Sequence, residues 1–142
     1  MKWLHSMGLK ACMLLSIATV SMSSGMAQQA PNTPQAKTEL LWLGQAGFRI
    51  KTPGGQTIVI DPWLTGGPKT PAPYKTDIAA LGKVDLLLVT HAHVDHIGDA
   101  PALAKLHKTV LYGPADMITP LITLGVVPAE LTHRFNKTGH VK

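Results

Sequence analysis

Short apolar runs separated by turns predict three consecutive strands at the start of the folded region. The second run alternates apolar and basic residues, as a half-exposed strand does, and the third is β-branched at every position. Glycine-containing turns at 44–47 and 53–55 separate the runs. The predicted strands of this meander are Glu39–Leu43, Phe48–Lys51 and Thr57–Ile60.

The pattern then changes to an alternation of strands and helices. Leu86–Val89 is apolar at every position, so we expect a strand buried on both faces. Asp99 is predicted to cap a helix that carries Pro101 in its first turn, and a fifth strand follows at Thr109–Tyr112. Strand and helix in alternation indicate an α/β fold with layered helices and strands.

The segments around these elements are less regular. Trp63–Tyr74 is rich in glycine and proline and is predicted to be a loop, either a functional rim or a plain connector. A short helix is expected to follow, capped by Thr76 or Asp77 and running through Leu81, with Gly82 past its end.

The last third of the sequence has the weakest pattern. A helix is predicted from Pro114, and Pro120 is expected to divide it into two short pieces, the second ending at Gly125. Val126–Lys142 shows no strong periodicity, so no final element is expected there.

The N-terminus has the layout of a secretory signal peptide. A basic start precedes the apolar run Ala11–Val20, and small residues lead to a predicted cut after Ala27. We therefore assign 1–27 as signal peptide, 28–37 as flexible linker and 38–142 as the domain, and we expect a periplasmic or secreted protein. The apolar run is short for a membrane span, although an uncleaved anchor is the alternative.

Composition narrows the functional classes. The 45% hydrophobic content fits a packed core. Thirteen Lys and Arg against eight Asp and Glu give a net charge of +5, but the cations are scattered without a basic stripe, so a nucleic-acid partner is not expected. The single cysteine, Cys12, lies in the predicted signal peptide, so the exported chain offers no thiolate ligand.

A cluster of metal-ligand side chains follows the buried strand at once. Alternate residues of an extended chain share a side, so His91 and His93 can converge on one ion, while Asp95 and His96 in the following loop can reach a second. Imidazole and carboxylate suit Zn best, and Mn or Fe as well. Two adjacent divalent ions would generate hydroxide at neutral pH, with Asp95 as both ligand and catalytic orienter.

Two further features bear on this site. The N-terminus of the helix after Asp99 would favour an anionic group on a small-molecule substrate. The later histidines lack the context of ligands: His107 falls on a helix and should be solvated, and His133 and His140 lie in the unpatterned tail.

The His91-Ala-His93-Val-Asp95-His96 run resembles the H-x-H-x-D-H signature of the metallo-β-lactamase-fold superfamily. Leu41-Trp42-Leu43-Gly44 and Asp61-Pro62-Trp63-Leu64 are similar to segments of the branch of metal-dependent hydrolases related to L-ascorbate-6-phosphate lactonase. The similarity runs from about Leu40 into the tail.

The resemblance implies an αββα sandwich with two metal ions at one edge of the sheets. It places Asp61 beside the site, where it would orient a ligand or the loop, although Asp61 could also be an ordinary turn residue before Pro62. Gln45 stands where many relatives carry a histidine, and its amide can still hydrogen-bond a substrate.

The resemblance also implies ligands from a second half that we do not find after His96. We therefore expect the N-terminal half of a hydrolase that uses metal-activated hydroxide on an ester, lactone, amide or phosphodiester bond. The alternative is a non-catalytic metal-binding or self-associating fragment, because an uncovered sheet favours pairing with another copy.

Overall fold

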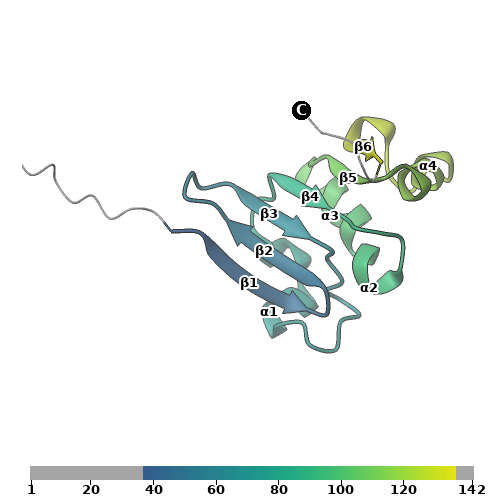
Figure 1. The fold of residues 1–142 in the computed structure, drawn as a ribbon. Coiled ribbons are helices and arrows are strands. Elements are labelled where there is room, and N and C mark those ends of the chain that lie inside the picture. The colour runs from purple at the N-terminus through teal and green to yellow at the C-terminus, as the bar shows by residue number, and fades with distance from the viewer. Residues whose placement is uncertain (1–36, 137–142) are drawn as a thin grey trace, which may run out of the picture. The chain divides into compact units, whose positions relative to one another are not determined.

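A six-stranded mixed sheet organises residues 37–136, the part of the chain that the computed structural model describes (Figure 1). The strands lie side by side in the order of the sequence. β1 to β3 are antiparallel neighbours, and β3 to β6 are parallel. The strands are β1 Glu39–Gly44, β2 Gly47–Lys51, β3 Thr57–Ile60, β4 Leu86–Leu88, β5 Leu111–Pro114 and β6 Thr132–Phe135.

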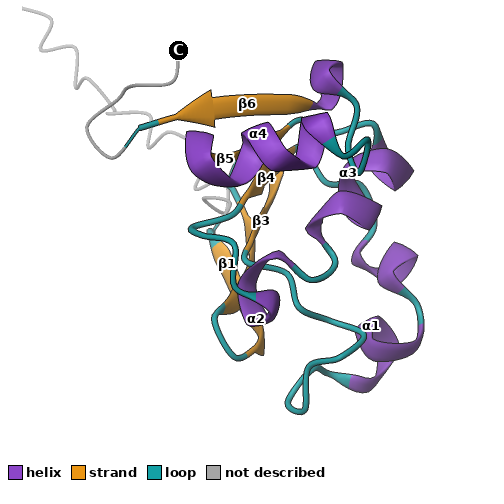
Figure 2. Ribbon diagram, turned by 90° about the vertical axis from the view of Figure 1, so that its right-hand side faces the viewer, coloured by secondary structure: helices purple, strands orange, loops and turns teal. Residues whose placement is uncertain are grey.

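The helices connect the parallel strands, as crossover connections require. Figure 2 shows α1 and α3 on one side of the strands, and Figure 1 shows α2 beyond the ends of β3 and β4. The helical elements are α1 Ala72–Thr76, η1 Ile78–Leu81, α2 Val94–Ile97, α3 Ala100–His107, α4 Ala115–Thr123 and η2 Ala129–Leu131. This mixed α/β architecture agrees with the predicted fold class.

The core lies between the sheet and α3. Val59, Leu87 and Leu111 are paired across β3, β4 and β5, so they share one face, and all three are fully buried. Leu103 and Ala104 of α3 are also fully buried and belong to the same apolar cluster. Burying one such aliphatic side chain contributes about 1.5–3 kcal/mol, so this layer holds the strand ends in place.

The opposite face of the sheet is also apolar. The register places two rows of large apolar side chains there, and the β1 members of these rows are the most open, with Leu40 65% and Trp42 50% exposed. The rows are Leu40, Ile50, Ile58 and Leu86, and Trp42, Phe48, Ile60, Leu88 and Tyr112. We call these two rows the outer sheet face.

Several local predictions are confirmed. The three N-terminal strands form at the predicted positions, with β1 extended to Gly44. The Asp77 carboxylate caps η1 by accepting the backbone N–H of Ala79 at 2.9 Å, and Gly82 follows with φ of 72°. The predicted loop after Trp63 forms, but it ends earlier than expected because α1 begins at Ala72.

The prediction that Pro120 divides a helix was wrong. α4 is one helix with Pro120 inside it. A proline in this position removes one backbone hydrogen bond, the one to the carbonyl four residues earlier. Packing offsets that loss, since Met117 and Ile118 are buried against the core, and the Pro120 carbonyl accepts the N–H of Leu124 at 2.9 Å.

The prediction of no element after Val126 was also wrong. η2 and β6 follow, and β6 pairs in parallel with β5. The strand is short and carries two exposed polar residues, His133 and Arg134, so the sequence shows no periodicity. Its position depends on backbone pairing with β5 and on the contact of the His133 and Tyr112 rings, whose centroids lie 5.0 Å apart.

His107 also differs from its predicted solvated state. Its ring is partly buried, and its Nε2 finds no hydrogen-bond partner in the part of the chain that the structure describes. The predicted signal peptide, most of the predicted linker, and His140 lie outside the described residues. Within the described residues, none of the helices combines the length and the apolar character needed to cross a membrane.

Candidate metal centre

The candidate site forms where β3 and β4 end. The two strands are parallel, so their carboxyl ends meet at the same edge of the sheet. Asp61 follows β3 directly, and Thr90 and His91 follow β4. Open α/β sheets bind ligands at this edge because the loops that follow the strands converge there.

Asp61 ties the two strand ends together. Its carboxylate accepts the backbone N–H of Thr90 at 2.7 Å and the Thr90 hydroxyl at 2.8 Å. Its own backbone N–H donates to the carbonyl of Leu88 at 3.0 Å. The residue is 3% exposed and has φ of 46°, a left-handed conformation that aspartate tolerates better than most residues. Asp61 is therefore more than an ordinary turn residue.

The same carboxylate orients His96. The Nδ1 of His96 lies 2.9 Å from Oδ2 of Asp61. A carboxylate only accepts hydrogen bonds, so Nδ1 of His96 donates to Asp61 and Nε2 is the nitrogen of that ring available to a metal ion. The Thr90 hydroxyl gives its one proton to Asp61 and lies 3.0 Å from Nδ1 of His91. It therefore accepts from Nδ1 of His91, and Nε2 is likewise the nitrogen of that ring available to a metal ion.

His91 and His93 converge as predicted. The Nε2 of His91 lies 3.0 Å from the Nδ1 of His93, and the two rings meet edge to face with centroids 4.6 Å apart. Two nitrogens bound to one tetrahedral Zn²⁺ at 2.0–2.1 Å are roughly 3.3 Å apart. The observed separation therefore fits a pair of donors to one ion.

Asp95 and His96 form a second pair of donors. The Oδ2 of Asp95 lies 3.7 Å from the Nε2 of His96, and the Asp95 side chain is 45% exposed. Both residues belong to α2, so the prediction that they lie in a loop was wrong. The His93 carbonyl accepts the N–H groups of His96 and Ile97, both at 3.0 Å, which closes the helical turn.

Each donor pair is incomplete by itself. Among residues 37–136, no group of three or more His, Cys, Asp or Glu side chains is arranged to hold one ion. A catalytic zinc site usually has three protein ligands. The described residues thus supply two donors at each of two adjacent points.

Asp99 holds the loop that follows Asp61. It is 7% exposed, and its carboxylate accepts the N–H of Leu64 at 2.5 Å, the N–H of Thr65 at 3.0 Å and the Thr65 hydroxyl at 2.9 Å. The predicted side-chain cap of α3 is absent because both oxygens serve this loop. The sequence had suggested that the start of α3 faces an anionic group on the substrate. Ala100 is fully buried, so the start of α3 is not open to a substrate.

Gln45 lies at the same edge of the sheet. It sits in the turn between β1 and β2 and is exposed, with φ of 47°. Its carbonyl accepts the indole N–H of Trp42 at 2.9 Å. The turn is close to the candidate site, since a Cβ atom on Gly47 would lie 3.1 Å from the carbonyl oxygen of Asp61.

A cavity of about 760 Å³ opens beside His91. One side is formed by the residues after β4, and the other by the first turn of α4 and the end of β6. Its lining is Thr90, His91, Ala92, Pro114, Ala115, Asp116, Met117, Phe135 and Asn136. Sequence reasoning missed Asp116 and Asn136, although both follow closely on strands of the parallel set.

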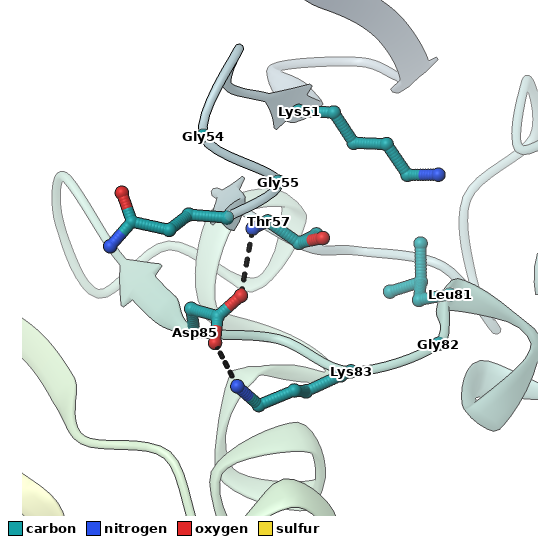
Figure 3. A pocket seen from close by; sticks show the side chains of 9 residues that line it. Lys51, Gly54, Gly55, Thr57, Leu81, Gly82, Lys83 and Asp85 are labelled. Atoms are coloured by element: carbon teal, nitrogen blue, oxygen red, sulfur yellow. Dashed lines mark hydrogen bonds and ion pairs between the residues drawn. The ribbon is translucent and has the colours of Figure 1, made fainter.

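A second cavity of about 410 Å³ lies among the loops at the other ends of the same strands (Figure 3). Asp85 there accepts the backbone N–H of Thr57 at 2.9 Å and pairs with Lys83. The hydrogen bond from Lys83, followed by that from Thr57, lowers the pKa of the Asp85 carboxyl below its usual value of 3.8. These contacts join the starts of β3 and β4.

A parallel sheet edge that presents paired histidine and carboxylate side chains is the arrangement expected of a metal-dependent hydrolase of the metallo-β-lactamase type. Residues 56–141 match the family described as the Beta-lactamase superfamily domain, and the chain belongs to that family.

Named relatives agree with this assignment. The chain is 67% identical over 133 residues to a UPF0173 metal-dependent hydrolase of Polynucleobacter asymbioticus, covering 94% of this chain and 45% of the relative. It is 58% identical to one of Cupriavidus necator, covering 74% of this chain and 36% of the relative. The structure of a metallo hydrolase from the archaeon Ignicoccus hospitalis matches with a TM-score of 0.57 and 28% identity, over 74% of this chain and 42% of that chain.

The family resemblance expected from the sequence is therefore confirmed. The chain spans less than half the length of these curated relatives.

Proposed function

We propose that this chain provides the metal-binding edge of a metal-dependent hydrolase. His91 and His93 would hold one divalent ion, and Asp95 and His96 a second. Zn²⁺ suits these donors best, and Mn²⁺ or Fe²⁺ also suits them. The observation that carries the proposal is the 3.0 Å approach of His91 Nε2 and His93 Nδ1, with the His91 ring oriented by the contact of its Nδ1 with Thr90.

The chemistry that a bound divalent ion supplies is the lowering of the pKa of water and the polarisation of a substrate oxygen. The described residues supply position and proton handling. Asp61 and Thr90 fix the ring orientations of His91 and His96. Asp95, partly exposed, can accept a proton on its second carboxylate oxygen during cleavage of an ester, lactone, amide or phosphodiester. Gln45, at the same edge, can donate its amide N–H to the substrate.

Metal binding is tested on the full chain by zinc titration against a chromophoric chelator. His93→Ala should bind zinc at least tenfold more weakly than the wild type, because one donor of a pair is lost. His133→Phe, which removes an exposed histidine from β6 but keeps a ring beside Tyr112, should leave zinc binding unchanged. Equally negligible zinc binding in the wild type and both variants would contradict the proposal.

Export is a separate proposal and rests on the layout of residues 1–27. Mass spectrometry of the protein recovered from its native cells should give a chain that begins at Gln28, in the periplasmic or secreted fraction. Recovery of the intact N-terminus from the cytoplasmic fraction would exclude it.

A second candidate is a non-catalytic, self-associating module, favoured by the outer sheet face. Leu40→Lys places a charge on that face, whereas Leu124→Lys changes a residue that is 76% exposed at the end of α4. If self-association uses the outer sheet face, light scattering should show a dimer or larger species that Leu40→Lys dissociates and Leu124→Lys preserves. A wild-type monomer at high concentration would exclude this candidate.

A further inference from the structure

Four consecutive parallel strands deliver polar side chains to one edge of the sheet. Asp61 follows β3, and Thr90 and His91 follow β4. Asp116 lies in the first turn of α4 directly after β5, and Asn136 follows β6. The proposed metal centre uses the residues after β3 and β4 as donors or as groups that orient donors, but Asp116 and Asn136 have no part in it.

The cavity beside His91 brings these two groups of residues together. His91 lines one side of it, and Asp116 and Asn136 line the other. A space of about 760 Å³ is large enough for a small-molecule substrate next to the proposed metal donors. α4 packs closely against the end of β5, since a Cβ atom on Gly113 would lie 2.1 Å from Cε of Met117 and 3.3 Å from Cγ1 of Ile118.

The lining defines what the cavity can accept. A carboxylate such as that of Asp116 only accepts hydrogen bonds, so a group facing it must donate one, as a hydroxyl, ammonium or amide N–H does. The Asn136 amide can donate and accept. Met117 and Phe135 add apolar surface for the hydrocarbon part of a ligand.

We propose that this cavity is the substrate-binding pocket of the metal centre, with Asp116 and Asn136 as residues that contact the substrate. The pocket then selects an ester, lactone or amide that carries a hydrogen-bond donor on the part of the substrate that faces Asp116. This inference rests on the proposed hydrolase function and narrows its substrate class.

Ligand binding, measured apart from turnover, tests the pocket. The full chain, labelled with ¹⁵N, is titrated with three probes of matched size: butylammonium, butanol and butyrate. Each titration is run with and without zinc. Butylammonium and butanol should shift the amide resonances of Asp116, Met117 and Asn136. Without zinc, butyrate should bind more weakly than either, because it carries no donor for the Asp116 carboxylate.

Asp116→Asn keeps the size of the side chain and removes its charge. It should weaken butylammonium binding about three- to tenfold and change butanol binding less, since a charge-assisted hydrogen bond is stronger than a neutral one. Asn136→Ala should weaken the binding of both butylammonium and butanol. Glu130→Gln is the matched control, because it removes an exposed carboxylate from η2, outside the cavity lining.

Three results would overturn the proposal: butyrate binding as tightly as butylammonium in the absence of zinc, shifts confined to residues outside the cavity, or equal effects of Asp116→Asn and Glu130→Gln. Each titration monitors all resolved amides, so a variant that fails to fold is recognised, and Asn136→Ala then provides the independent test. Zinc titration of the same samples reports on the metal centre separately, so a failed pocket and a failed metal site are distinguishable.

Discussion

The Asp61 carboxylate, 3% exposed, lies 2.9 Å from Nδ1 of His96 and couples the packing of the strand ends to the orientation of a proposed metal donor. The same carboxylate accepts two hydrogen bonds from Thr90. One side chain therefore serves the fold and the site at once.

Asp61→Ala should lower zinc affinity roughly 10- to 100-fold, the usual effect of removing a group that orients a metal-bound histidine. It should also lower the free energy of unfolding by about 1–3 kcal/mol, because the Thr90 N–H loses its acceptor. Chelator competition and urea denaturation measure the two effects. Asp77→Asn, at the exposed cap of η1, is the control and should alter only stability, and only slightly. Unchanged zinc affinity in Asp61→Ala would show that Asp61 has no role in metal binding.

Asp99→Ala should destabilise the protein by about 2–4 kcal/mol. The substitution removes a buried carboxylate and leaves the N–H groups of Leu64 and Thr65 without their acceptor. The loop after Asp61 should then exchange its amide protons faster. Hydrogen exchange measured by mass spectrometry checks this directly. Protection at 64–65 equal to that of the wild type would show that other contacts hold the loop.

Asp85 should make stability depend on pH in the acid range. Its pKa in the folded state is lowered below 3.8, chiefly by the hydrogen bond from Lys83. A lowered folded-state pKa gives stability that is fully present above the unfolded-state value and is lost as pH falls through the folded-state pKa. The difference in unfolding free energy between wild type and Asp85→Asn should therefore be constant above about pH 5 and shrink below pH 3.8. Denaturant titrations across this range measure it, and a difference independent of pH would contradict the assignment.

Pro120→Ala should stabilise α4 by about 1–3 kcal/mol. The substitution restores the N–H that can donate to the carbonyl four residues earlier, and alanine has the higher helix propensity. Thermal unfolding should shift upward while zinc affinity stays the same. A destabilised variant would indicate that the proline ring contributes packing that the helix needs.

The sequence was sufficient for the elements whose side chains carry a pattern. The three-strand meander, the strand at Leu86 and the H-x-H-x-D-H cluster were all predicted at their positions. The prediction that this strand is buried on both faces was wrong, since Leu86 and Leu88 are only partly buried. β6 was missed because its position depends on backbone pairing with β5. Backbone pairing requires no particular pattern of side chains, so the sequence does not reveal it. Pro120 misled the prediction because local propensity cannot report the burial of Met117 and Ile118, which keeps α4 whole.

The site was predicted in the same uneven way. His91, His93, Asp95 and His96 are close in sequence, so their spacing was informative. Asp61 was noticed through the family resemblance, but its hydrogen bonds span 29 and 35 residues and could not be derived from local pattern. Asp116 and Asn136 went unnoticed because each is an isolated polar residue, and only the parallel order of the strands brings them to the cavity.

Apart from Asp61, stability and chemistry occupy different residues of the parallel strands and the loops that follow them. Val59, Leu87 and Leu111, within their strands, make the core, whereas the polar groups come just after the strand ends. A lineage can therefore exchange residues at this edge and alter what is bound or cleaved without repacking the interior. A deep mutational scan should give two maps that barely overlap, one for abundance centred on the strands and one for ligand preference centred on the loops that follow them.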